Sequence, residues 1–166
     1  MPDDKRILIY AYGNPGRQDD GLGNRFIEEI SRWIENENLP HVELESNYQL
    51  NIEDAVTIAG RELVVFIDAS IEDIEDYRLS EVIPSEGRSE FTMHSVSPAF
   101  VLALCIRLYD KHPRTYLLSI KGYEWEFREG LSDRAEMNLS RALAFLKEKL
   151  EDPASLSEPP KDNPVG

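Results

Sequence analysis

The sequence predicts an α/β fold, a three-layer sandwich whose twisted sheet is mostly parallel with one antiparallel edge strand and has helices on both faces. Short apolar runs alternate with amphipathic helical patterns along most of the chain, which is typical of a parallel sheet. The run at 62–69 (ELVVFIDA) is continuously apolar until its aspartate, as expected for a central strand. The length of 166 residues fits one domain, which we predict for residues 1–150.

The other elements follow from hydrophobic periodicity. We expect strands at 6–13, 41–45, 77–83 and 115–120, and helices at 21–36, 50–59, 99–109 and 132–150. Pro84 places the strand before it at a sheet edge, and Ser97-Pro98 is a helix N-cap followed by a first-turn proline. Gly60 is expected to end its helix in a left-handed conformation. Residues 151–166 hold four of the ten prolines and no apolar periodicity, so we predict a disordered acidic tail.

Composition excludes several classes of partner. The formal net charge is −14, which disfavours binding to nucleic acid and to anionic membranes. Cys105 is the single cysteine, so neither an internal disulfide nor a thiolate metal cluster is possible, and its apolar helix predicts a core thiol. The N-terminus lacks the pattern of a signal peptide, and no apolar run reaches the roughly 20 residues of a membrane span. We therefore expect a cytoplasmic protein. We also expect it to work as a monomer.

Three polar residues are expected at the carboxyl ends of the strands, where ligands bind in open α/β sheets. Asp20 follows the first strand, Asp68 ends the strand at 62–69, and His94 precedes the helix capped by Ser97. Two carboxylates and an imidazole form a ligand set suited to nickel, zinc, manganese or iron(II), and such an ion could polarise a carbonyl or activate water. The sequence thus predicts one cleft containing Asp20, Asp68 and His94.

Each of these residues also has a structural interpretation. Asp19 and Asp20 precede a helix, where at least one carboxylate would be expected to act as a cap. Asp68 could accept hydrogen bonds from loop N–H groups, and a single loop histidine is commonly structural. The segment GNPGRQDDGLG contains neither a GxGxxG dinucleotide fingerprint nor a P-loop, and its glycines also suit a tight turn between strand and helix.

The order of these motifs resembles the nickel–iron hydrogenase maturation proteases. GNPGRQDDGLG after the first strand, IDAS after a central strand, MHSVSP, and GLS before the last helix follow one another from about residue 6 to residue 150. The resemblance implies an endopeptidase that removes a C-terminal extension from the hydrogenase large-subunit precursor after nickel insertion. It also implies that Asp20, Asp68 and His94 are both the catalytic and the metal-contacting residues, and that the nickel comes with the precursor.

Two alternatives stay open at this point. A metal-sensing chaperone or binding module for the large subunit could use the same three ligands without cutting a peptide bond. A peptidyl-tRNA hydrolase also carries GNPG after its first strand, but its catalytic histidine follows within a few residues. Here the corresponding stretch is RQDDGLGN, which has no histidine, and the chain is strongly acidic.

Overall fold

A single five-stranded sheet forms the centre of the computed structural model, which describes residues 5–87 and 96–157. The strand order is β2-β1-β3-β5-β4. The parallel strands are β1 (Ile7–Tyr12), β2 (Val42–Asn47), β3 (Leu63–Ser70) and β5 (Arg114–Lys121). Strand β4 (Tyr77–Glu81) pairs antiparallel with β5 at one edge, so the predicted fold class is confirmed.

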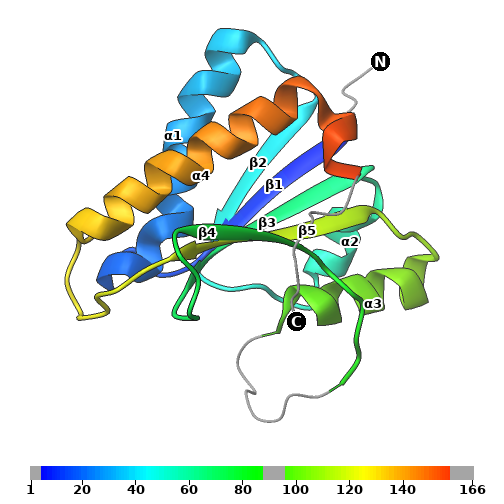
Figure 1. The fold of residues 1–166 in the computed structure, drawn as a ribbon. Coiled ribbons are helices and arrows are strands. Elements are labelled where there is room, and N and C mark those ends of the chain that lie inside the picture. Colours follow the sequence, from blue (N-terminus) through cyan, green and yellow to red (C-terminus); the bar gives the residue numbers. More distant parts are fainter. Residues whose placement is uncertain (1–4, 88–95, 158–166) are drawn as a thin grey trace.

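Two helices cover each face of the sheet (Figure 1). Helices α1 (Leu22–Glu37) and α4 (Asp133–Glu151) lie side by side on one face, and α2 (Asp54–Ala59) and α3 (Pro98–Tyr109) lie on the other. The central strands are buried on both sides, which explains their continuous apolar sequence. In β1, Ile7, Ile9 and Ala11 belong to the core beneath α1 and α4, while Leu8 and Tyr10 belong to the core beneath α2 and α3.

The predicted serine cap and first-turn proline of α3 are confirmed, and α4 begins with a serine cap of the same kind. The Ser97 hydroxyl accepts from the Phe100 N–H at 3.1 Å, and Pro98 occupies the first helical position. The Ser132 hydroxyl accepts from the Ala135 N–H at 3.2 Å. Each serine satisfies an N–H group that has no partner within its own helix.

The prediction for the helix at 50–59 is wrong in two respects. The helix is shorter, because the Asp54 carboxylate accepts from the Asn51 N–H at 2.8 Å and from the Tyr10 hydroxyl at 2.7 Å. These bonds hold the residues before Asp54 in a turn and connect that turn to the core. Gly60 has a φ of −93°, so the helix ends without a left-handed residue.

The predicted disordered tail is wrong for Pro153–Ser157. These residues form a 3₁₀ helix, η2, and Leu156 is 1% exposed in the core shared with α1 and α4. One apolar side chain just beyond the end of α4 is enough to return this segment to the core, and a single residue has no periodicity to reveal it. Residues 158–166 lie outside the described residues.

Among residues 5–87 and 96–157, no helix combines the length and the apolar character that crossing a membrane requires.

Candidate active and metal-binding site

The candidate site lies at the carboxyl edge of the sheet, between β1 and β3. From β1 the chain passes to β2 on one side, whereas β3 lies on the other side of β1. The loops after β1 and β3 therefore leave in different directions, and ligands bind at such a switch point in open α/β sheets. The glycine loop, residues 13–21, follows β1, and Asp68 lies near the end of β3.

Asp20 is fixed by its own loop. It belongs to a short 3₁₀ helix, η1 (Gln18–Gly21), and its Oδ2 accepts from the Asn14 N–H at 3.0 Å. Gly13 has a φ of +152°, and a Cβ atom at this position would lie 2.1 Å from the Asp20 carbonyl oxygen. Only glycine fits there, because any side chain would meet both the steric contact and the unfavourable backbone conformation.

Asp68 lies close to Asp20 in a poorly hydrated position. Burial raises its pKa, the negative charge of Asp20 raises it further, and hydrogen bonds from the Ala69 N–H and the Tyr12 hydroxyl lower it, with a result of about 7. Asp20 therefore lies near enough to Asp68 for its charge to act on the Asp68 carboxyl, as a shared site would require, while a joint catalytic or metal-binding role stays a prediction. Two carboxylates that repel each other in this way favour either a shared proton or a bound cation.

Tyr12 is a contact of this site that the sequence does not predict. Its hydroxyl bonds Asp68, and its ring meets Phe66 edge-on at 6.4 Å between centroids. Burial and the neighbouring Asp68 hold the pKa of Tyr12 well above its ordinary value, so the phenol stays protonated and donates. In the register of β1 against β3, Ala11 pairs with Ile67. This register places the next residues, Tyr12 and Asp68, beside each other.

His94 lies outside the described residues, so its place relative to Asp20 and Asp68 stays a prediction. Within the described ranges, no group of three His, Cys, Asp or Glu side chains is arranged to hold a metal ion. Val96, two residues after His94, packs against the same apolar cluster as Tyr12. Cys105 is fully buried, as expected of a core thiol.

The prediction that at least one of Asp19 and Asp20 caps the helix after them is wrong, and Asp19 has a different role. No side chain caps η1 or α1. The Asp19 carboxylate is fully buried and points instead to the β5–α4 loop, residues 122–132. It accepts four hydrogen bonds, from the N–H groups of Tyr123 (2.7 Å), Glu124 (3.0 Å) and Ser132 (2.8 Å) and from the Ser132 hydroxyl (2.7 Å).

These bonds make Asp19 a stable buried anion. Burial by itself raises the pKa of Asp19, but the four donors outweigh it and hold the pKa below its ordinary value. Gly122 permits the close approach, because a Cβ atom there would lie 2.8 Å from the Asp19 Cβ. The two adjacent aspartates thus have different roles. Asp19 joins two loops, and Asp20 lies near Asp68.

Gln18 strengthens the same junction. Its Nε2 donates to the Glu124 carboxylate at 3.1 Å, its Oε1 accepts from the Glu126 N–H at 2.9 Å, and its backbone N–H donates to the Arg128 carbonyl at 2.8 Å. Gln18 is 5% exposed and has a φ of +47°, a left-handed conformation that is uncommon outside glycine. The contacts around it hold the residue in that conformation.

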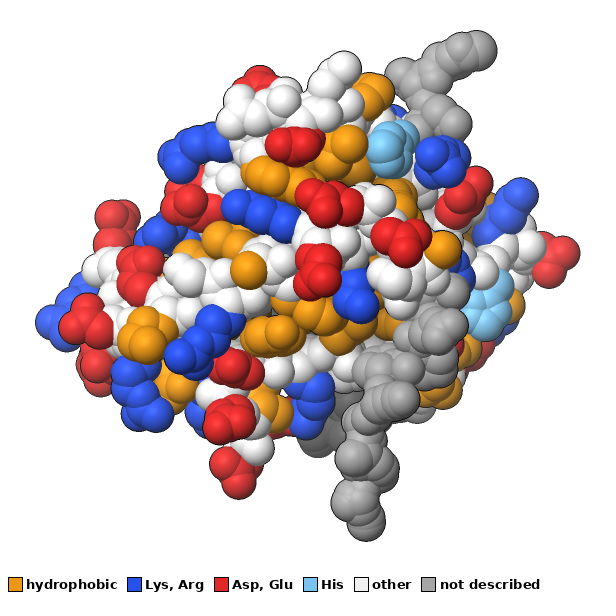
Figure 2. Space-filling view, turned by 45° about the horizontal axis from the view of Figure 1, so that its top comes forward, with side chains coloured by type: hydrophobic (Ala, Val, Ile, Leu, Met, Phe, Trp, Pro, Cys, Tyr) orange, Lys and Arg blue, Asp and Glu red, His pale blue; other side chains and the backbone are white. Residues whose placement is uncertain are grey.

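The loops at the carboxyl edge carry more than half of the net negative charge of the protein. Residues 13–21, 48–53, 71–76 and 122–132 hold ten acidic side chains and two arginines, a net charge of −8 out of −14 in 32 of the 166 residues. On the face shown in Figure 2, acidic and basic side chains are interspersed. The candidate site therefore lies in the most acidic part of the described chain, which favours cations and basic partners.

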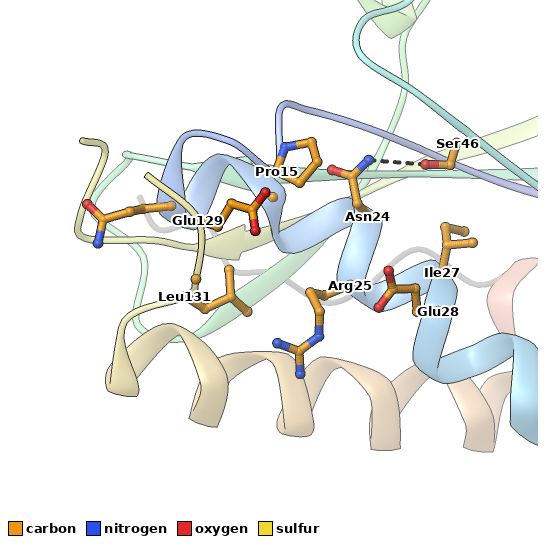
Figure 3. Close-up of a pocket in the computed structure, with 11 residues that line it drawn as sticks. Pro15, Asn24, Arg25, Ile27, Glu28, Ser46, Glu129 and Leu131 are labelled. Carbon is orange, nitrogen blue, oxygen red and sulfur yellow. Dashed lines mark hydrogen bonds between the residues drawn. The ribbon is translucent and has the colours of Figure 1, made fainter. Parts of the chain in front are cut away.

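A groove of about 470 Å³ opens beside the glycine loop (Figure 3). Pro15 and Leu131 border it on the loop side, and Asn24, Arg25 and Ile27 border it on the side of α1. The Arg25 guanidinium points towards α4 and bonds the Glu136 carboxylate at 3.0 and 3.2 Å. The groove also contacts Gly21, the residue after Asp20.

Comparison with solved structures identifies the fold. The NiFe hydrogenase maturation protease HycI from Thermococcus kodakarensis KOD1 superposes with a TM-score of 0.70, covering 89% of this chain and 94% of its own at 20% identity. The fold is that of the hydrogenase maturation proteases. The maturating endopeptidase HybD from E. coli gives a TM-score of 0.67 at 20% identity, covering 89% of this chain and 93% of its own. The hydrogenase 2 maturation peptidase from Thaumarchaeota archaeon SCGC_AB-539-E09 gives 0.61 at 23% identity, covering 88% and 98%.

The likeness to this fold is structural. No known protein-family profile matches the chain, and no curated protein matches its sequence. The three proteases cover nearly the whole folded part of the chain, so the resemblance of the sequence motifs is confirmed at the level of the fold.

Proposed function

We propose that this chain is an endopeptidase that removes the C-terminal extension of a nickel–iron hydrogenase large-subunit precursor after nickel insertion. The observation that carries the proposal is the convergence of Asp20 and Asp68 at the switch point of a maturation-protease fold. The order of the glycine-loop, IDAS and MHSVSP motifs supports the same family.

In this proposal nickel belongs to the substrate. Asp20 and Asp68 provide two oxygen donors whose mutual repulsion a divalent cation would relieve, and His94 is proposed as the third donor from its motif. The remaining ligands would come from precursor thiolates. When bound, the ion supplies Lewis acidity at the scissile carbonyl.

The residues of this chain would orient the precursor and move a proton. In the metal-free chain the pKa of Asp68 is about 7, so this carboxyl takes up and releases a proton at neutral pH, as a general base must. Tyr12 holds the Asp68 carboxylate by its hydroxyl, and Asn14 holds that of Asp20. This arrangement limits how far either carboxylate can turn away from a bound group.

The acidic edge disfavours the peptidyl-tRNA hydrolase alternative. The four edge loops have a net charge of −8, and a tRNA backbone would be repelled where a substrate must bind. The same surface suits a protein whose contact region is basic.

The test combines the purified chain with a nickel-loaded large-subunit precursor, and mass spectrometry detects the released C-terminal fragment. We expect cleavage by the wild type and a loss of about 100-fold or more in Asp20→Ala, Asp68→Ala and His94→Ala. Asp152→Ala, at an exposed aspartate beyond α4, is the matched control and should cleave normally.

Two results would contradict the proposal. Normal cleavage by Asp20→Ala or Asp68→Ala would move the site elsewhere. Nickel-dependent binding of the precursor with no fragment from the wild type would instead indicate the metal-sensing chaperone.

A further inference from the structure

Phe127 is the most exposed large hydrophobic residue among those that the structure describes. Its side chain is 83% exposed and lies in the β5–α4 loop. A single exposed hydrophobic residue needs no functional explanation. Phe127 differs from such a residue because of how its loop is held and of what surrounds it.

The β5–α4 loop has no helix or strand of its own, yet it is fixed to the glycine loop at many points. Asp19 and Gln18 bind five residues of this loop. Arg17 adds a bond from Nε to the Trp125 carbonyl at 3.2 Å, and its guanidinium lies 5.3 Å from the centre of the Phe127 ring. The ring is thus presented to solvent from a preorganised support, which lowers the entropy lost when it is buried by a partner.

The surroundings of Phe127 are acidic. Glu124, Glu126 and Glu129 flank it in the same loop, against Arg128 and the Arg17 guanidinium that lies over the ring. An exposed aromatic residue with a charged, net acidic border is the arrangement of a binding anchor with a polar rim. The matching surface is an apolar pocket bordered by lysine or arginine.

The position of the loop relates this anchor to the candidate site. The glycine loop that supports Phe127 is the loop that carries Asp20, and Asp19 directly joins the two loops. A partner seated on Phe127 would therefore lie at the carboxyl edge, where Asp20 and Asp68 meet.

We propose that Phe127 is a docking anchor that inserts into an apolar, basic-rimmed pocket of the large-subunit precursor. The identity of this partner rests on the proposed function. Phe127 acts in binding and takes no part in the chemical step, and Glu126 and Glu129 steer the basic rim toward it.

The test measures the Kd of the wild type and of Phe127→Ala for nickel-loaded precursor by calorimetry, and the KM and kcat of cleavage. We expect Phe127→Ala to raise Kd and KM about tenfold or more and to leave kcat unchanged. Leu108→Ala is the matched control. Leu108 is 59% exposed near the end of α3, which leads to the start of β5 on the opposite edge, so both constants should be unchanged.

A charge variant tests the rim separately. Glu126→Lys combined with Glu129→Lys should raise KM and reduce its dependence on salt, because steering between opposite charges is screened by ions. Thermal unfolding checks that each variant is folded, and we expect no change for Phe127→Ala because its ring is exposed.

The outcomes separate this inference from the proposed function. If the wild type cleaves and Phe127→Ala has the same Kd and KM as Leu108→Ala, the docking role is overturned while the protease function stands. If the wild type binds without cleaving and Phe127→Ala weakens binding, the docking role stands and the protease function is lost. If the wild type neither binds nor cleaves, both are overturned.

Discussion

Ser132 bonds Asp19 twice, through its backbone N–H at 2.8 Å and its hydroxyl at 2.7 Å, while the same hydroxyl caps α4 through the Ala135 N–H. The first turn of α4 is thereby joined to the loop after β1, 113 residues earlier in the chain. The geometry of the candidate site depends on this long-range contact, because Asp20 is the next residue.

Replacing Asp19 is expected to destabilise the fold. Asp19→Ala leaves the N–H groups of Tyr123, Glu124 and Ser132 without their acceptor, and buried unpaired donors are costly. We expect the free energy of unfolding in urea to fall by about 3 kcal/mol or more. Asp73→Ala, in an exposed loop, should change it by less than about 0.5 kcal/mol.

A double-mutant cycle with Ser132→Ala tests whether the contact itself is responsible. Ser132→Ala removes the hydroxyl bond to Asp19 and keeps the backbone N–H bond, so the combined loss should be smaller than the sum of the single losses by the coupling of the hydroxyl bond. Additive losses would show that Asp19 acts through its backbone N–H donors and gains nothing from the Ser132 hydroxyl.

The lowered pKa of Asp19 predicts that the folded protein loses stability in acid. The pKa of Asp19 is lower in the folded than in the unfolded chain, so its stabilising effect is present above the ordinary aspartate pKa of about 4. That effect is lost as the pH falls through the folded-state value. Wild-type stability should therefore drop between about pH 5 and about pH 3, and Asp19→Asn should show a shallower drop over the same range in urea titrations. Parallel curves would contradict the role of Asp19.

The raised pKa of Asp68 predicts the opposite dependence of stability on pH. Burial and Asp20 raise its pKa to about 7, so the unfolded chain loses this proton near pH 4 while the folded chain retains it to near pH 7. Asp68 therefore increasingly opposes folding as the pH rises from about 4 to about 7. We expect Asp68→Asn to raise Tm by about 3 °C or more at pH 8 and to leave it unchanged at pH 4.

Nickel gives this prediction a second measurement. If Asp20 and Asp68 bind the ion, adding Ni²⁺ at pH 8 should raise the wild-type Tm and leave that of Asp68→Asn unchanged.

The pH comparison has its own contradicting outcome. A Tm of Asp68→Asn equal to the wild type at both pH values would show that the pKa of Asp68 is not raised in the folded chain.

Gly13 and Gly60 form a matched pair for testing the glycine loop. Gly13→Ala would place a Cβ atom 2.1 Å from the Asp20 carbonyl oxygen at a φ of +152°, so it should destabilise the chain by about 3 kcal/mol or more. Gly60 has a φ of −93°, and no atom lies within 4 Å of the place that a Cβ would take, so Gly60→Ala should be neutral or slightly stabilising. Equal effects in thermal melts would contradict the steric role of Gly13.

Much of the fold could be predicted because its signals are local. The apolar runs of β1, β3 and β5, and the serine cap of α3, lie within a few residues of the structure that they specify. The convergence of Asp20 and Asp68 followed from a general property of open parallel sheets, in which the strand ends meet at one edge.

Other features could not be predicted because they depend on distant residues. At least one of Asp19 and Asp20 was expected to cap the helix after them, but the partners of Asp19 are more than 100 residues away and leave no local pattern. Tyr12 bonds Asp68 through the register of β1 against β3. Leu156 returns to the core as one residue, which periodicity cannot detect.

The different partners of Asp19 and Asp20 have a consequence for laboratory evolution. In a randomised library selected for folding alone, position 19 should retain aspartate, because its four donors need a carboxylate, whereas position 20 should accept other residues. Selection for cleavage of the precursor should restore a carboxylate at position 20. Sequencing the two surviving pools would thus show that Asp19 is needed for folding and that Asp20 is needed for cleavage.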